Sequence, residues 1–343
     1  MLPDRQSAAT ETVIAMDFNY PISECDVRKA EIPRLEKFRE RFIVWQEWLS
    51  RDEHSIWDQI YGMLWNDMVF RTINECRRLA HNSPSPNVAF NRAVASLIDE
   101  GYVAKQLLAI RRLTETNRRR DAIALPRLID DMKANADLFT REIYVCNDGL
   151  PFDPDPAFQK RLEKLAIEGE KNGGVTFSRP DTKGPNAFLS SKRIHAHFDR
   201  LIGAEGKPWS RDDKLDPAIF DKIKSKLSVC DGINKVASKF IAHAADAGSR
   251  GNINEKERSV TLDRIEKCQR IICRVASYIN GPLLYIGSPG LIPIPQYDHL
   301  EYLEKGWLDP TNIGAIAQYW KKREMKVEKW ADGNWDSLLK LPG

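Results

Sequence analysis

The sequence predicts an all-α protein, built as an antiparallel up-and-down helical bundle and closed by an irregular C-terminal strap. Three observations predict this class. Apolar residues recur at intervals of three and four along most of the chain, which is the period of an amphipathic helix. Proline and small polar residues gather between these periodic segments, as they do in loops. No segment alternates apolar and polar residues persuasively, as a half-buried strand would.

The first half of the chain divides into four predicted helices. The first follows Pro33, because proline suits the first turn of a helix and apolar residues follow it at helical spacing to Leu49. The second ends at the loop HNSPSPN, residues 81–87, whose two prolines break a helix. We expect these helices at about 33–49, 55–80, 88–114 and 121–146.

The second half begins with a turn-rich connection at 147–158 and then returns to helical spacing. Asp216 and Pro217 open a long helix as cap and first helical residue. Asn254 with Glu257 resembles a capping box for a further helix, which Gly281-Pro282 stops. We expect helices at about 155–172, 186–202, 216–247 and 255–280, and a final helix that carries Trp320 and Trp330.

Changes in composition predict three parts of the chain. Residues 1–30 form an N-terminal arm, and residues 31–280 form the helical bundle. Residues 281–343 are rich in proline and tryptophan, and we expect them to pack on the bundle as an extension. The bundle contains a loop insertion at 147–185, whose stretch 171–185, KNGGVTFSRPDTKGP, has the composition of a linker or mobile loop.

Composition and charge exclude several classes of protein. The 343 residues are 42% hydrophobic and 29% charged, which is typical of a soluble globular protein. A formal net charge of +3 demands neither nucleic acid nor a membrane as partner. The six cysteines include no CxxC pair, so they indicate buried thiols in a reducing compartment. With no signal-peptide pattern and no apolar run of about 18 residues, we expect a cytoplasmic protein without a membrane span.

The stretch KVASKFIAHAAD carries the strongest candidate site. Lys239, His243 and Asp246 are spaced i, i+4, i+7 and therefore share one stripe of a helix, with Lys235 one turn earlier. Histidine can act as a general base near neutral pH, and a lysine can stabilise a charged phosphorane. One interpretation is thus a catalytic set for RNA cleavage without a metal. The other is that His243 bonds a neighbouring helix while Lys239 is solvated.

Arginines form the second group of candidates. Arg111 and Arg112 interrupt an apolar helix, and Arg141 has similar surroundings. A cation within an apolar face usually has a carboxylate partner, which gives salt bridges between helices as one interpretation. The other is that these arginines bind substrate in the same groove as His243. The run at 118–120, three arginines, is either solvated surface or a phosphate contact.

The HAH stretch offers a weaker candidate for metal binding. His195 and His197 are two residues apart, so they point to different faces of the helix that their apolar neighbours predict. Lys192 and Arg193 precede these histidines and remain candidates for a weak contact with phosphate. The chain has no GxGxxG, GxxxxGK[ST], HExxH or GxSxG motif, which excludes the commonest nucleotide, zinc-protease and hydrolase sites. We expect no cofactor and no metal.

Three stretches in this order resemble the HEPN superfamily, especially its branch associated with bacterial abortive infection. They are LLAIRRLTE at 107–115, DAIALPRLIDDM at 121–132 and KFIAHAAD at 239–246. In that branch an apolar helix ends in an arginine-leucine-threonine or arginine-leucine-acid step, and a later helix carries a basic residue followed by isoleucine-alanine-histidine. The ordered likeness spans roughly residues 35–280.

The resemblance implies an all-α up-and-down bundle that often dimerises through its long helices, and a metal-independent endoribonuclease in the active members. It implies His243 as the family's histidine. If the chain cleaves RNA, we expect His243 as the base, Lys239 as the phosphate cation, Arg112 as a second cation and Asp246 as the residue that orients the histidine. The family places an arginine before this histidine, with four to six residues between the two. Those positions here, 236–238, hold no arginine, and Lys239 lies closer.

We therefore expect a HEPN-like protein of a bacterial defence or stress system that cleaves RNA, or binds RNA or a partner without cleaving. A homodimer follows by analogy. The alternative is a non-catalytic protein-interaction scaffold, whose tryptophan-rich tail and basic loops dock a protein partner. A third possibility is a small-molecule enzyme that uses the HAH stretch and a metal.

Overall fold

The computed structural model is all-α over the residues that it describes, which confirms the all-α part of the predicted fold. Within those residues no strand occurs, and the nearest approach to one is an isolated antiparallel bridge between Thr140 and Lys214. No helix in this part of the chain is long and apolar enough to cross a membrane. The described residues are 18–81, 92–117, 121–174, 181–242, 259–287, 290–292, 294–295, 297–301, 303, 310–331 and 333.

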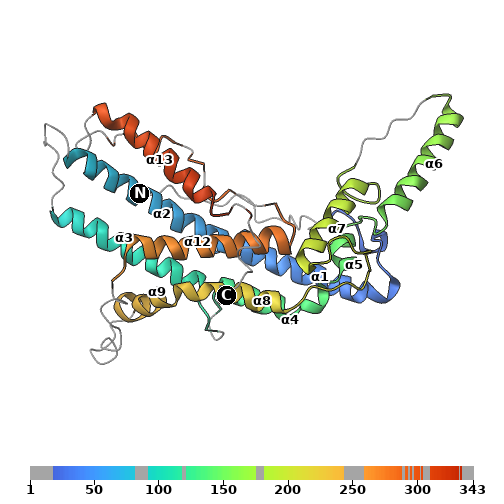
Figure 1. The fold of residues 1–343 in the computed structure, drawn as a ribbon, viewed down its shortest axis with the longest axis horizontal. Helices are drawn as coiled ribbons and strands as arrows, with labels where there is room; N and C mark the ends of the chain where they lie inside the picture. The colour runs from blue at the N-terminus through green and yellow to red at the C-terminus, as the bar shows by residue number, and fades with distance from the viewer. Residues whose placement is uncertain are drawn as a thin grey trace, which may run out of the picture. The chain divides into compact units, whose positions relative to one another are not determined.

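The helices follow the predicted order along the chain (Figure 1). Short 3-10 or π-helical turns extend or connect several of them, and those used below are η4 Ala136–Leu138, η5 Leu227–Cys230, η6 Ala237–Ala242 and η7 Ile279–Leu283. The α-helices are α1 Ile32–Gln46, α2 Ile56–His81, α3 Arg92–Leu113, α4 Leu125–Ala134, α5 Arg141–Cys146, α6 Pro154–Asn172, α7 Phe188–Ile202, α8 Ala218–Lys226, α9 Asp231–Val236, α12 Leu262–Tyr278 and α13 Ile313–Glu328.

The single helix predicted at 121–146 is wrong, because polar side chains interrupt it twice. The side-chain amide of Asn135 donates to the Asp131 carbonyl at 2.9 Å and ends α4. After the η4 turn, the Thr140 hydroxyl accepts a hydrogen bond from the Ile143 amide and caps the start of α5. Such side chains compete with the helical hydrogen bonds, so they favour caps over helix interiors.

The long helix predicted from residue 216 is also divided. The 3-10 turn η5 separates α8 from α9, and η6 continues α9 as a π-helical turn. The helix predicted at 255–280 begins only at Leu262, where Thr261 is the cap and accepts from the Arg264 amide at 3.2 Å. Pro282 does not stop it at once, since η7 carries the helix to Leu283.

Several predicted features lie outside the described residues. They include most of the loop at 81–87, the three arginines at 118–120 and part of the stretch 171–185. The proposed capping pair Asn254 and Glu257 belongs here too, as does the end of the helix predicted at 216–247.

Contacts divide the chain into two compact units. The first comprises residues 1–43 and 137–215, and the second comprises residues 44–136 and 216–343. These bounds differ from the predicted divisions at residues 30 and 280, since the middle of the chain forms a unit with its N-terminal segment.

In the first unit, α5 and α6 both pack on α7. The buried carboxylate of Glu142 accepts hydrogen bonds from the guanidinium groups of Arg28 and Arg211, each at 2.8 Å. Buried charges of this kind persist only when they are paired. The pairs therefore join the segments before α1 and after α7 to α5.

In the second unit, α2, α3 and α12 lie side by side, and α13 packs on α2 (Figure 1). A buried ionic cluster connects these helices: Arg323 of α13 binds Asp67 of α2 at 2.5 Å and Glu266 of α12 at 2.9 Å. Asp67 also accepts from Tyr102 of α3 and Arg71 of α2. Most of the remaining core is apolar, with almost fully buried side chains at Trp57, Ile60, Leu64, Ile110, Leu113, Ile265 and Ile272.

Candidate functional site

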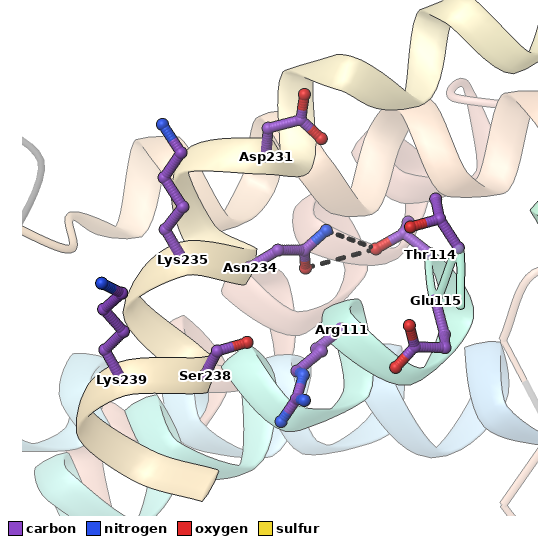
Figure 2. Close-up of a pocket in the computed structure, with 9 residues that line it drawn as sticks. Arg111, Thr114, Glu115, Asp231, Asn234, Lys235, Ser238 and Lys239 are labelled. Atoms are coloured by element: carbon purple, nitrogen blue, oxygen red, sulfur yellow. Dashed lines mark hydrogen bonds between the residues drawn. The ribbon is translucent and has the colours of Figure 1, made fainter. Parts of the chain in front are cut away.

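A groove on the second unit runs between the end of α3 and the α9–η6 segment (Figure 2). Its volume is about 430 Å³, large enough for a nucleotide-sized ligand. Both walls are polar or charged. The lining residues are Arg111, Thr114, Glu115 and Thr116 from the end of α3, Asp231, Asn234 and Lys235 from α9, and Ser238 and Lys239 from η6.

Buried apolar side chains and a chain of hydrogen bonds hold α9 against α3. Ile233 and Val236 of α9 are buried, and they leave the lysine stripe on the outer side of the helix. The side-chain amide of Asn234 donates to the Thr114 hydroxyl at 2.9 Å, and that hydroxyl donates to the Ile110 carbonyl at 2.7 Å. This chain of hydrogen bonds fixes the register of α9 against the last turn of α3 and thereby sets the spacing of the groove walls.

Positive charge predominates in the groove. Arg111, Lys235 and Lys239 supply three cations, against two carboxylates from Glu115 and Asp231. Figure 2 shows the two lysines extending in the same direction from successive turns, while Arg111 comes from the other helix. Arg111 and Lys239 are half-buried and Lys235 is exposed. Ammonium groups act as point charges toward phosphate, and a guanidinium can add a bidentate contact.

The groove brings together three of the predicted site residues, Arg111, Lys235 and Lys239. His243 and Asp246 lie outside the described residues, so their roles stay predictions. Sequence reasoning missed Asn234 and the other polar lining residues. The signal for Asn234 was its place one residue before Lys235, which puts it beside the lysine stripe on a helix.

Arg112 does not line this groove. Consecutive residues of a helix point about 100° apart, and Arg112 is exposed beside a separate depression of about 210 Å³. His54, Asp58 and Lys105 also line that depression. Arg111 and Arg112 thus face different surroundings, although the sequence analysis gave both of them one role.

Arg141 lies in the first unit, where the structure confirms the salt bridges given as one of its two interpretations. Its side chain is only 1% exposed. Its Nε atom binds Asp213 at 2.7 Å, its Nη2 atom binds Asp199 at 2.6 Å, and Nη1 donates to the carbonyl of His195. All three guanidinium nitrogens are therefore engaged inside this unit.

The two histidines of the HAH stretch face different surroundings on α7, as its helical spacing predicts. The Nε2 atom of His195 lies 2.8 Å from the Phe152 carbonyl, which can only accept, so Nε2 carries the proton. The ring is buried and stacks on Trp209 at 3.9 Å. Burial lowers the pKa of His195 to about 4 and keeps it neutral. In the described part of the chain, no group of three potential ligands could hold a metal.

The tryptophans of the final helix region are packed inside the second unit. Trp320 and Trp330 are 7% and 5% exposed. Arg323 and Arg270 lie over the Trp330 ring. These two tryptophans therefore do not provide the docking surface that the scaffold alternative assigned to the tail.

Comparison of the chain with protein-family models, with curated proteins and with solved structures found no match. The function must therefore be argued from the groove and from the sequence stretches that line it.

Proposed function

We propose that this chain is a HEPN-like protein of a bacterial defence or stress system, with an up-and-down bundle as its core, that binds RNA in the groove between α3 and α9. The observation that carries the proposal is that Arg111, Lys235 and Lys239 line one polar groove. Arg111 and Lys239 belong to two of the three stretches that resemble the superfamily, and Lys235 lies one turn before the second of these.

The ligand we propose is the phosphate backbone of RNA. Three cations from two walls suit a chain of phosphates better than a neutral ligand, and binding of this kind depends on ionic strength. The groove also offers the hydroxyl of Ser238 and the amide of Asn234, which can bond ribose or base edges.

We assign a second, catalytic step to His243, which follows Lys239 by four residues. The imidazole takes the proton of the 2′-hydroxyl, the 2′-oxygen attacks phosphorus, and Lys239 stabilises the negative charge of the phosphorane. The P–O5′ bond then breaks, which leaves a 2′,3′-cyclic phosphate on one fragment, and the departing 5′-oxygen takes a proton from water to become a 5′-hydroxyl. Asp246 orients the imidazole. No step requires a metal ion. Dimerisation through the long helices belongs to this proposal by analogy with the superfamily.

Two measurements separate binding from cleavage. The purified chain is incubated with a fluorescent single-stranded RNA in EDTA, and both anisotropy and cleavage products are recorded. We expect the double variant Lys235→Gln/Lys239→Gln to lose binding, while His243→Ala binds but does not cleave. Lys222→Gln, an exposed lysine of α8, is the matched control and should behave as wild type.

Each outcome has a distinct meaning. Equal binding by wild type and the double lysine variant would refute the groove as the RNA site. Binding without cleavage in wild type would leave an RNA-binding protein and remove the catalytic step. Absence of binding to any RNA would favour the non-catalytic protein-interaction scaffold.

A further inference from the structure

Two thiols meet where the segment that carries the groove lysines packs on α12. Cys230 ends η5, directly before α9, and η5 lies along α12. The Cys268 thiol on α12 donates to the carbonyl of Val229, the residue before Cys230, at 3.7 Å. This hydrogen bond places the Cys268 sulfur beside Cys230, whose thiol can donate to it. The two cysteines are therefore neighbours, although they are 38 positions apart in the sequence.

From this contact we propose that Cys230 and Cys268 form a reversible disulfide, a modification site that ties the α9–η6 segment to α12. The inference stands on the thiol contact and does not depend on the proposed RNA function. The new bond would close a loop of the chain that includes Asn234, Lys235 and Lys239, so it would fix the wall of the groove that these residues form.

The chemistry of the pair is asymmetric. The hydrogen bond from Cys230 and the nearby guanidinium of Arg264 lower the pKa of Cys268. The pKa of Cys230 is raised by that hydrogen bond and by burial. Burial raises the pKa of the other four cysteines, all of which lie within the described residues. A thiolate is the reactive form, so Cys268 is the attacking thiol.

The surroundings of the pair support this assignment. Arg264 precedes Cys268 by one turn of α12, and its Nη2 atom would lie 2.8 Å from a Cβ atom at Gly232. The absence of a side chain at Gly232 leaves room for the guanidinium against α9, and a Cβ atom there would displace the end of the arginine side chain. Both cysteines are buried, and the adjacent Val229 is 54% exposed, so the pair lies close below the protein surface.

Hydrogen peroxide is a sufficient oxidant. The Cys268 thiolate attacks one peroxide oxygen, the O–O bond breaks, and hydroxide leaves with a sulfenic acid remaining on Cys268. The Cys230 sulfur then attacks the Cys268 sulfur, and the sulfenic oxygen leaves as water with the Cys230 proton. In total, two thiols and one peroxide give one disulfide and two waters.

The test uses the full chain, treated with hydrogen peroxide under native conditions and then digested for mass spectrometry. We expect a peptide that contains Cys230 to be linked to one that contains Cys268, and dithiothreitol to release both. The control Cys25→Ser removes a thiol of the first unit and should give the same linked pair. A different pair, or no linked peptide, would overturn the proposal.

Single variants test the order of the two steps. In Cys230→Ser the reaction should stop at the sulfenic acid of Cys268, which dimedone labels. In Cys268→Ser the remaining Cys230 should take up no label. Labelling of Cys230 in that variant, or no labelling of Cys268 in the first, would contradict the assigned roles.

Discussion

Arg141 in the first unit and Arg111 in the second have the same signature in the sequence, a cation within an apolar helix. Their surroundings differ completely. Arg141 is sealed beneath the surface, with carboxylates from Asp199 and Asp213 on two of its nitrogens. Arg111 is half-buried and faces a groove that also holds Lys235 and Lys239. An arginine of the first kind maintains the fold, and one of the second kind is available to a ligand.

The comparison shows that carboxylates from distant segments decide the role of an arginine. Asp199 and Asp213 lie 58 and 72 residues beyond Arg141 in the sequence. The spacing of residues along one helix cannot reveal such partners. For this reason the sequence left both arginines with the same two interpretations, a salt bridge between helices or a contact with substrate. Substitutions at residues of the two units test whether distant carboxylates separate the roles of the two arginines.

The largest effect is expected for Arg141→Ala. The substitution leaves the carboxylates of Asp199 and Asp213 without their cation, and breaking a buried ion pair on one side costs about 3–5 kcal/mol. Urea unfolding followed by circular dichroism measures the free energy. Arg111→Ala is the matched control and should change stability by less than about 1 kcal/mol. Equal losses in the two variants would abolish the distinction between the two arginines.

The second-largest effect is a dependence of the free energy of unfolding on pH, which comes from His195. This residue belongs to the same buried cluster, because its carbonyl accepts a hydrogen bond from Arg141. Its pKa is about 4 in the folded protein and about 6.5 when unfolded, so the unfolded state binds its proton first as pH falls. The contribution to stability is therefore complete above pH 6.5 and decreases toward pH 4, by about 3 kcal/mol in total. Urea midpoints at several pH values measure it. In His195→Phe this part of the pH dependence should vanish, and an unchanged slope would contradict the burial argument.

A smaller effect is expected for Asn234→Ala at the junction of α9 with α3. The variant loses the hydrogen bond to Thr114, which contributes about 1 kcal/mol in a partly buried position. The same loss should reduce protection of the α9 amides from hydrogen exchange. Thr114→Ser keeps the hydroxyl and is the control. If α9 protection were unaffected in Asn234→Ala, that bond would not set the groove wall.

The smallest effect on stability, within about 0.5 kcal/mol, is expected for Lys235→Gln/Lys239→Gln, because neither ammonium is fully buried. Its effect on RNA binding should be large. The slope of log affinity against log salt should become shallower by about 1.4 when two phosphate contacts are lost from a single strand. An unchanged slope with unchanged affinity would mean that the lysines do not meet phosphate.

The sequence by itself determined the all-α class, most of the helices and the lysine stripe. Their signals are local: apolar period, proline and glycine punctuation, and residues one turn apart. The stripe of Lys235 and Lys239 survives even though η6 is a π-helical turn, because residues four apart remain about one turn apart.

Only the tertiary structure decided which candidates share a site. In the folded chain, Arg111 lines the groove with the lysines, whereas Arg112 lines another depression. Arg141 is buried and paired with carboxylates. The fold also brought the thiols of Cys230 and Cys268 together. The physical reason is that side-chain roles depend on partners, charges and burial supplied by segments far away in the chain, whereas helical periodicity depends only on neighbours within a few turns.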